Sequence, residues 1–183
     1  MAGDNVELLA RPADVPEVEE TEDSLTGNAR KKAAALVAAT GLPAIAEDTG
    51  IEVSALGGAP GVRSARYAGE PPDDEANVDR VLAELRDMAL DSPKERRARF
   101  VTVAVAQWPG GKELVTEGVV EGWVAPERRG TGGFGYDPVF VPDEGDGRTF
   151  GEMEESAPGS KHLLSHRGRA FRALAALLVR RPA

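Results

Sequence analysis

The sequence predicts one α/β domain. Three stretches of helical periodicity alternate along the chain with short apolar runs typical of strands, and no internal repeat or low-complexity linker separates them. The chain has 183 residues, of which 41% are hydrophobic and 29% charged, and this is ordinary for a globular domain with a real core. We therefore expect residues 1–183 to form a single domain.

The first expected elements are a short strand over residues 6–9 and a helix over residues 28–40. The acidic run at residues 17–23 lies in the loop between them and is interpreted as solvated surface. Small and apolar side chains recur at i, i+4, i+7 and i+8 in the helix, which places them on one stripe. Gly41 is expected to end this helix.

The next segment is expected to contain two short strands. Residues 44–46 form an apolar run that is too short for a helix and leads directly into Glu-Asp-Thr-Gly at residues 47–50. This pattern predicts a strand that ends in two carboxylates and a turn. A second short strand is expected at residues 51–53, followed by a glycine-rich loop at residues 57–61.

A second helix is expected over residues 73–88, with Asp73 or Asp74 as its N-cap. A hairpin follows, in which residues 99–107 and residues 113–124 flank a glycine-rich turn. Both faces of the first arm are apolar, which indicates a strand that is covered on both sides.

The last expected elements are a short strand over residues 139–141 and a helix over residues 161–179. The apolar positions of this helix recur at helical spacing and predict its buried stripe. They are Leu164, Phe171, Leu174, Ala175 and Leu178.

Composition excludes several classes of protein. The 31 acidic and 22 basic residues give a net charge of −9, which argues against a protein that coats nucleic acid, although a small anionic substrate needs only a local basic pocket. The absence of cysteine excludes disulfides, thiolate metal sites and a cysteine nucleophile. No stretch approaches the roughly 18 apolar residues of a membrane helix, and the N-terminus does not read as a signal peptide. We expect a cytoplasmic protein that binds no membrane.

Residues 47–50 are the first candidate site. Hard divalent cations prefer oxygen ligands, and Mg²⁺ commonly bridges one or two carboxylates to substrate phosphates, so Glu47 and Asp48 suit such an ion. A turn in which Asp48 caps the backbone is the structural alternative. The spacing alone favours neither.

The glycine-dense loop at residues 130–135 is the second candidate. It matches the G-x-G-x-x-G pattern, but no helix follows it, so we reject a dinucleotide-binding fingerprint. The loop presents Phe134, with Tyr136 two residues further on, and an aromatic ring in such a loop can stack on a planar base. A packed turn with core aromatics is the alternative.

Basic and polar side chains at the start of the last helix are the third candidate. Lys161, Ser165, His166 and Arg167 supply hydrogen-bond donors without an acidic partner, which suits a carbonyl-bearing or anionic ligand. A helix end that simply carries charge is the alternative. His162 and His166 have the i, i+4 spacing of a metal pair, but no third ligand is evident. A further basic cluster at residues 30–32 weakly indicates anion binding.

Together these motifs resemble the inosine triphosphate pyrophosphatase family over about residues 6 to 180. Five stretches match in the order of the family. They are residues 27–33 (GNARKKA), 41–50 (GLPAIAEDTG), 56–70 (LGGAPGVRSARYAGE), 132–138 (GGFGYDP) and 161–167 (KHLLSHR).

The resemblance implies a homodimer of elongated, two-lobed α/β subunits, each with a mixed β-sheet flanked by helices and a substrate cleft between the lobes. It also implies hydrolysis, dependent on Mg²⁺, of non-standard purine nucleoside triphosphates such as ITP, dITP and XTP to the monophosphate and pyrophosphate. A non-catalytic nucleotide-binding or dimerising remnant is the alternative.

The resemblance also assigns roles to residues. Asp48 would be the catalytic base and, with Glu47, a metal ligand. Lys32 and Thr49 would contact the substrate. The purine would stack on Phe134, and its pocket and base edge would be formed by six further residues. They are Gly135, Tyr136, Asp137, Lys161, His166 and Arg167.

Two departures from the family pattern stand out. The family opens with a strand and a Ser/Thr-x-Asn-x-x-Lys loop that holds the triphosphate, and Val6 already aligns with its second strand. We therefore expect the single domain to be truncated at its N-terminus relative to the family. In addition, many members carry a metal-binding Glu immediately before Asn28 or one residue earlier, where this chain has Gly27 and Thr26.

Overall fold

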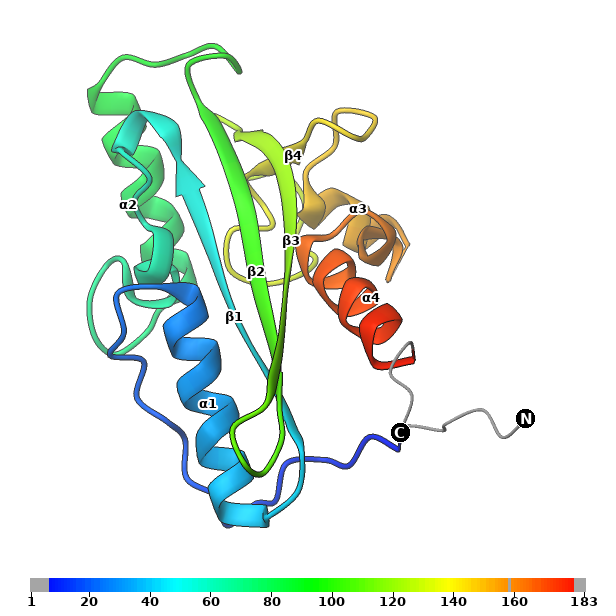
Figure 1. Ribbon diagram of the computed structural model, residues 1–183. Coiled ribbons are helices and arrows are strands. Elements are labelled where there is room, and N and C mark those ends of the chain that lie inside the picture. Colours follow the sequence, from blue (N-terminus) through cyan, green and yellow to red (C-terminus); the bar gives the residue numbers. More distant parts are fainter. Residues whose placement is uncertain (1–6, 158, 180–183) are drawn as a thin grey trace.

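The computed structural model describes residues 7–157 and 159–179, which form an antiparallel sheet flanked by helices (Figure 1). The sheet has four strands in the order β1-β2-β3-β4. Their bounds are Ala44–Val53 for β1, Arg97–Gln107 for β2, Glu113–Val124 for β3 and Phe140–Pro142 for β4. The helices are α1 (Leu25–Thr40), α2 (Asp74–Asp87), α3 (Phe150–Ser156) and α4 (His166–Val179), and short 3₁₀ turns cover Ser54–Leu56, Gly61–Arg66 and Ser160–Leu163.

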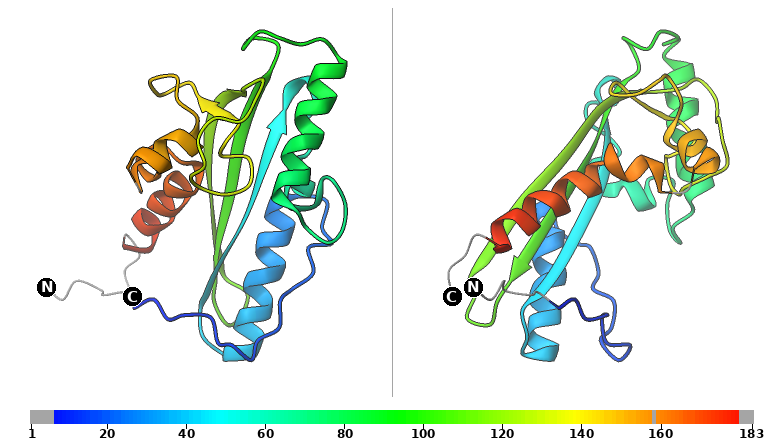
Figure 2. Two further views of the ribbon diagram at one scale, coloured as in Figure 1. Left: turned by 180° about the vertical axis from the view of Figure 1, so that it is seen from behind. Right: turned by 90° about the vertical axis from the view of Figure 1, so that its right-hand side faces the viewer.

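The two faces of the sheet are covered by different helices (Figure 2). On one face α1 packs Leu25, Ala29 and Ala33 against the valines of β2. On the other face α4 packs Ala170 and Leu174 against the alanines of β2, while α2 and α3 enclose the largest core cluster at the end where β4 lies. Because β2 is covered on both sides, its apolar residues face both ways, as the sequence predicts.

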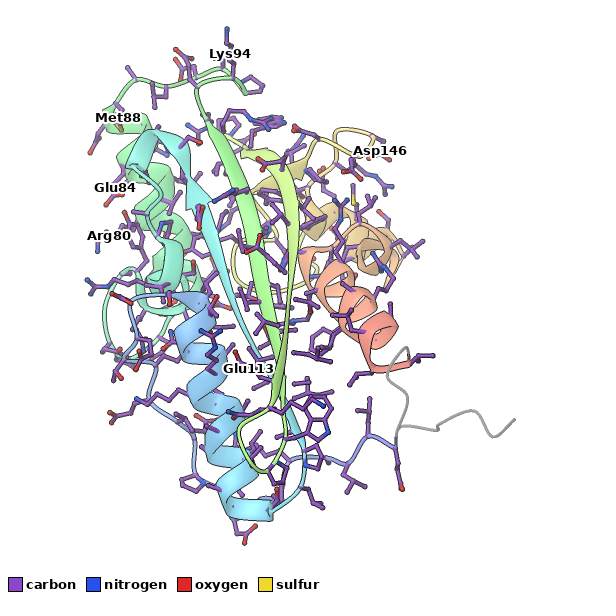
Figure 3. The ribbon with its side chains drawn as sticks, viewed as in Figure 1. Arg80, Glu84, Met88, Lys94, Glu113 and Asp146 are labelled. Atoms are coloured by element: carbon purple, nitrogen blue, oxygen red, sulfur yellow. The ribbon has the colours of Figure 1, made fainter. Side chains whose placement is uncertain are left out.

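The α/β class is confirmed, but the described sheet is antiparallel at every strand pair and not mixed. The molecule is elongated, with the β2–β3 hairpin running along its length (Figure 1). The start of β3, directly after the hairpin turn, is held to α1, since Glu113 of β3, labelled in Figure 3, accepts a hydrogen bond of 2.8 Å from Arg30.

Helix boundaries follow local capping. Ser24 accepts a hydrogen bond from the backbone of Gly27, so α1 begins at Leu25, three residues before the predicted start. Gly41 ends it in the left-handed conformation, with φ 68°. Asp73 caps α2 as predicted.

The expected division of residues 44–53 into two strands and a turn is wrong. The segment is one strand that pairs with β2 from Ala44 to Val53. Gly50 is required by close approach, because a Cβ there would lie 2.4 Å from the carbonyl oxygen of Gly61. The glycine therefore marks a contact between β1 and a 3₁₀ turn, not a change of chain direction.

Other expectations need correction at the chain ends. Glu7–Leu9 form no strand, Leu8 and Leu9 are exposed, and Val6 lies outside the described residues. The predicted helix over 161–179 is a 3₁₀ turn followed by α4, because Ser165 interrupts it and accepts a hydrogen bond from Gly168.

Two predictions about the last helices also fail. Phe171 and Ala175 are exposed, although the periodicity placed them in the buried stripe. Helix α3 was not predicted, although Thr149 and Glu152 form a capping box at its start. A helix of seven residues is too short to show a clear hydrophobic period in the sequence. In the described part of the chain, no helix combines the length and apolarity needed to cross a membrane.

Candidate active site

Asp48 is buried between β1 and α1. Its side chain extends from the α1 face of the strand, where Oδ1 accepts a hydrogen bond of 2.8 Å from Nζ of Lys32 and Oδ2 accepts one of 3.1 Å from Nδ2 of Asn28. Asn28 and Lys32 are one turn apart on α1, so both reach the same carboxylate. The residue is 6% exposed, and its carboxylate is held by donors from a single helix.

Glu20 adds a second carboxylate to this cluster. Its Oε1 lies 2.5 Å from Nζ of Lys32, so the ammonium group stands between Glu20 and Asp48. Arg66 donates to the backbone oxygen of Glu20 and lies 3.5 Å from its carboxylate. We call Glu20, Asn28, Lys32, Asp48 and Arg66 the carboxylate cluster.

Glu20 is not identified as a site residue from the sequence, and Arg66 appears there only within the matching stretch at residues 56–70. Glu20 belongs to the acidic run that was interpreted as solvated surface, and its side chain is only 25% exposed. The acidic run was the only local signal, and nothing in it distinguishes Glu20 from its neighbours. Glu20 is distinguished from the other acidic residues by its contact with Lys32 of α1, and this contact exists only in the folded chain.

A cavity of about 310 Å³ adjoins the carboxylate cluster. It lies between the N-terminal segment, α1 and β1, and Glu20 and Lys32 are in its wall. Its other lining residues are Arg11, Val15, Pro16, Glu17, Val18, Leu36 and Ala46.

Burial sets the protonation behaviour of the pair. It raises the pKa of Asp48 above its ordinary value, against the opposing effect of hydrogen bonds from Lys32 and Asn28. Burial alone would lower the pKa of Lys32, but hydrogen bonds to Asp48 and Glu20, together with their charges, raise it. Lys32 is therefore charged at neutral pH, and it lies beside a carboxylate with increased basicity.

Glu47 and Thr49 extend from the opposite face of β1, because neighbouring residues of a strand alternate in direction. The Thr49 hydroxyl donates to Glu47 Oε2 at 2.7 Å, and Arg167 Nη2 donates to Glu47 Oε1 at 2.6 Å. The structure therefore does not bring Glu47 and Asp48 to one point. Glu20, not Glu47, is the carboxylate that meets Asp48 at a common cation.

The hydroxyl of Thr49 continues into a buried chain of hydrogen bonds. It lies 2.7 Å from the hydroxyl of Thr102, which lies 2.7 Å from Nδ1 of His166. His166 can approach the sheet this closely because Gly118 pairs with Thr102 in the register and has no side chain. A Cβ at Gly118 would lie 2.1 Å from the backbone oxygen of His166.

Phe134 is exposed and accompanied by two cations. The residue is 55% exposed, and the centroid of its ring lies 4.5 Å from Nζ of Lys161 and 5.3 Å from Cζ of Arg167. Lys161 also forms a buried ion pair with Asp137, which accepts a hydrogen bond of 2.9 Å from the backbone of Phe134. Burial raises the pKa of Asp137, and the charge of Lys161 opposes that effect. We call Phe134, Asp137, Lys161 and Arg167 the aromatic cluster.

Tyr136 and Gly135 anchor the loop that carries Phe134 to neighbouring segments of the chain. Tyr136 is 4% exposed, and its hydroxyl donates to the backbone oxygen of Ser64 at 3.0 Å. The backbone of Gly135 donates to Asp74 at 3.0 Å. The packed-turn reading therefore describes Tyr136, while Phe134 is left free on the surface of the same loop.

His166 is buried next to the aromatic cluster. Its ring stacks on Phe100, with ring centroids 4.4 Å apart and planes 19° from parallel. Burial, together with the charges of Arg167 and Lys161, lowers the pKa of His166 to about 3, so the imidazole is neutral at physiological pH.

The described residues contain no group of three or more histidine, cysteine, aspartate or glutamate side chains that could hold a metal ion. Glu20 and Asp48 supply two carboxylates at one place, and both already contact the cationic end of Lys32. Oxygen ligands of this kind are what Mg²⁺ prefers, and it usually keeps several waters and takes its remaining ligands from substrate phosphates. The residues present therefore fit such an ion bound together with a phosphate ligand.

Comparison with known proteins gives consistent matches over most of the chain. The sequence pattern of the Ham1 family matches residues 2–177. A protein of Symbiobacterium thermophilum named dITP/XTP pyrophosphatase is 50% identical over 183 residues, which cover 100% of this chain and 86% of that protein.

Solved structures show the same relationship. A Ham1 protein from Coxiella burnetii has a TM-score of 0.82 and 40% identity, covering 91% of this chain and 82% of its own. A structure from Mycobacterium abscessus, described as a nucleoside-triphosphatase / dITP/XTP pyrophosphatase, has a TM-score of 0.74 and 43% identity, covering 96% of this chain and 87% of its own.

Proposed function

Since this chain belongs to the Ham1 family, we propose that it hydrolyses non-standard purine nucleoside triphosphates, among them dITP, ITP and XTP, to the nucleoside monophosphate and pyrophosphate. The observation that carries the proposal is the convergence of Glu20, Lys32, Asp48 and Arg66 between the middle of β1 and the middle of α1. Such an activity would cleanse the nucleotide pool. The chain would act as one pyrophosphatase domain.

The carboxylate cluster is suited to a triphosphate bound with Mg²⁺. Glu20 and Asp48 would hold the ion, which would supply positive charge against the phosphates. Lys32 and Arg66 would exchange part of their present contact with Glu20 for phosphate oxygens, because both are cations with donors directed into this cluster.

Asp48 would act as the general base. Its buried carboxylate has a raised pKa, which makes it a better proton acceptor than an exposed aspartate. It would orient a water molecule for attack on phosphorus and take its proton, while Asn28 and Lys32 keep the carboxylate in place. Positive charge from Lys32 and Arg66 would oppose the negative charge that grows during attack.

The aromatic cluster would receive the base. The exposed ring of Phe134 offers a stacking surface, and Lys161 and Arg167 supply donors beside it. Thr49 and the backbone of Gly135 would complete the contacts, with Tyr136 and Asp137 holding the loop. Because β1 lies at the edge of the sheet that the described residues form, a nucleotide lying across that edge could meet side chains from both faces of the strand.

The test is release of pyrophosphate in the presence of Mg²⁺ from ITP, dITP and XTP, compared with ATP and GTP. We expect hydrolysis of the first three at least about tenfold faster than of ATP, since unpaired polar groups discriminate strongly. Equal rates for all five would contradict the proposed specificity. Binding of inosine monophosphate by calorimetry without any turnover would instead indicate a non-catalytic nucleotide-binding protein.

We also propose that the protein is a homodimer in the cytoplasm, where nucleoside triphosphates are used. Exposed apolar side chains on and before α4, namely Leu163, Phe171, Leu177 and Val179, support a covered surface there. Sedimentation velocity should give a species of twice the monomer mass of 19.3 kDa. A monomer at all concentrations up to the millimolar range would contradict the dimer.

A further inference from the structure

Thr102 lies at the centre of a buried chain of polar groups that joins β1 to α4. It is 0% exposed, and its hydroxyl contacts the hydroxyl of Thr49 on one side and Nδ1 of His166 on the other, each at 2.7 Å. At the far end, Thr49 donates to Glu47. We call Glu47, Thr49, Thr102 and His166 the hydroxyl relay.

The direction of every hydrogen bond in the relay follows from counting protons. Glu47 is paired with Arg167 and its carboxylate is only an acceptor, so the single proton of the Thr49 hydroxyl points to Glu47. Thr49 can then only accept from Thr102. The single proton of Thr102 is used in that bond, so Thr102 accepts from His166, and Nδ1 of His166 must carry a proton.

A neutral imidazole has one N–H. Because burial and the neighbouring cations keep His166 uncharged, a proton on Nδ1 leaves Nε2 with a lone pair. Stacking on Phe100 fixes the plane of the ring, so this acceptor keeps one direction. His166 was expected to add a donor to the base-binding group, and the relay reverses that expectation.

We propose that Thr102 is a positioning residue that holds His166 in the Nδ1–H tautomer, so that Nε2 selects purines with a hydrogen on N1. This rests on the proposed function. The 6-oxopurines hypoxanthine and xanthine carry a hydrogen on N1, next to the carbonyl at C6, whereas adenine has a lone pair at N1. Lys161 and Arg167 can donate to the carbonyl, and His166 accepts from N1–H, so the three residues together match a 6-oxopurine edge.

The pairing with adenine fails at two adjacent positions. Its N1 lone pair would face the lone pair of Nε2, and its 6-amino group would face the cationic donors of Lys161 and Arg167. A buried polar group without a partner lowers affinity by roughly 10- to 100-fold. Guanine carries the same N1–H and C6 carbonyl, so the relay gives no discrimination against it.

The relay can be tested without any substrate. The chain has two histidines, and ¹⁵N NMR of the imidazoles distinguishes a protonated ring nitrogen from an unprotonated one. Comparison with His166→Gln assigns the signals. We expect His166 to show a protonated Nδ1 and an unprotonated Nε2 in the wild type. Thr102→Val keeps the shape and removes the acceptor, so the Nε2–H tautomer should become populated, and Thr102→Ser should restore the wild-type signals.

The matched control is Thr116→Val. Thr116 is another buried threonine on the adjacent strand β3, and its hydroxyl also contacts α4, through the backbone oxygen of Ala170. Loss of this bond should change stability without changing the tautomer of His166. In hydrolysis assays, Thr102→Val should lower kcat/KM for ITP by roughly 10-fold or more and leave the low value for ATP unchanged. Thr116→Val should preserve the ITP to ATP ratio.

Three results would overturn the inference. They are a wild-type His166 protonated on Nε2, a Thr102→Val variant with an unchanged tautomer, and a Thr102→Val variant with an unchanged ITP to ATP ratio. A wild type that shows the Nδ1–H tautomer but no ITP hydrolysis would overturn the specificity role because the proposed function fails, while supporting the relay itself. ITP hydrolysis with the wrong tautomer would overturn the relay and leave the proposed function intact.

Discussion

Asp48 combines burial with strong hydrogen bonding, and these have opposite effects on its pKa. Removal from water disfavours the charged form, whereas Lys32 and Asn28 favour it, and burial dominates. A carboxylate that is costly to keep ionised contributes little to stability at neutral pH. This behaviour supports the proposed role of Asp48 as the general base.

The first prediction follows for Asp48→Asn. Asparagine keeps the shape and removes the proton acceptor and the charge that attracts a metal ion, so kcat for ITP should fall roughly 100-fold or more. The melting temperature should change little. Near-full activity in this variant would place the base elsewhere. Glu19→Gln is the control, since Glu19 is an exposed acid outside the cluster and its loss should leave kcat unchanged.

The second prediction concerns His166 and pH. Its folded-state pKa is about 3, below the ordinary value near 6.5, so between these values the unfolded chain binds a proton that the folded chain does not. Stability is fully present above about pH 6.5 and is lost as the pH falls towards 3. The contribution is about 1.4 kcal/mol per pH unit at most.

Urea unfolding between pH 7.5 and pH 4.5 measures this effect. The free energy of unfolding of the wild type should fall more steeply with decreasing pH than that of His166→Gln, which has no group to protonate. Parallel profiles for the two proteins would show that His166 titrates normally in the folded state.

At the scale of elements, strand alternation and helix packing divide the site. Because side chains alternate along β1, Asp48 faces α1, whereas Glu47 and Thr49 face the side covered by α4. On that side α4 approaches the sheet closely over Gly118. The contact between β3 and α4 therefore determines where His166 and Arg167 lie.

The third prediction tests this contact with Gly118→Ala. The new Cβ would collide with the backbone of α4, at 2.1 Å from the oxygen of His166 and 2.4 Å from the nitrogen of Ala170. Relieving the collision should destabilise the protein by about 1–3 kcal/mol in urea unfolding and reduce ITP hydrolysis, because α4 must move. Val115→Ala is the control on the same strand. Val115 is 37% exposed, so its change should stay within about 0.5 kcal/mol. Equal effects of the two substitutions would contradict a close contact at Gly118.

At the scale of the whole molecule, Glu20 joins the N-terminal segment to α1 and to the 3₁₀ turn that ends at Arg66. Its contacts with Lys32 and Arg66 bring one member of an acidic run into the site while the net charge of the chain is −9. A divalent cation could therefore bind weakly at many surface positions. Only a matched pair of variants separates binding at Glu20 from this general attraction.

The fourth prediction uses that pair. A ligand that binds only the folded state at ten times its Kd stabilises it by about 1.4 kcal/mol, which should raise the melting temperature by roughly 3–5 °C. We expect Mg²⁺ to produce such a shift in the wild type and in Glu19→Gln. The shift should be largely lost in Glu20→Gln, which lacks one of the two converging carboxylates. Equal shifts in all three proteins would exclude Glu20 as a ligand.

The sequence by itself determined the α/β class, the helices α1 and α2 and the hairpin, because these depend on local signals. Ser24, Gly41 and Asp73 cap their helices through contacts within one turn. The run of apolar residues in β2 is visible over a few positions of the sequence. The five motif stretches contain Lys32, Asp48, Phe134 and Lys161, which the structure gathers into two clusters.

Only the tertiary structure decided which of these residues meet. The turn expected at Gly50 is absent because that glycine serves a contact with Gly61, in a 3₁₀ turn that packs back on β1. Glu20 differs from its acidic neighbours only in the folded chain, where it contacts Lys32 of α1. The ring nitrogen of His166 that carries the proton likewise depends on the contact with Thr102 of β2. Side-chain direction, burial and hydrogen-bond polarity arise from packing between elements, and no local pattern in the sequence contains them.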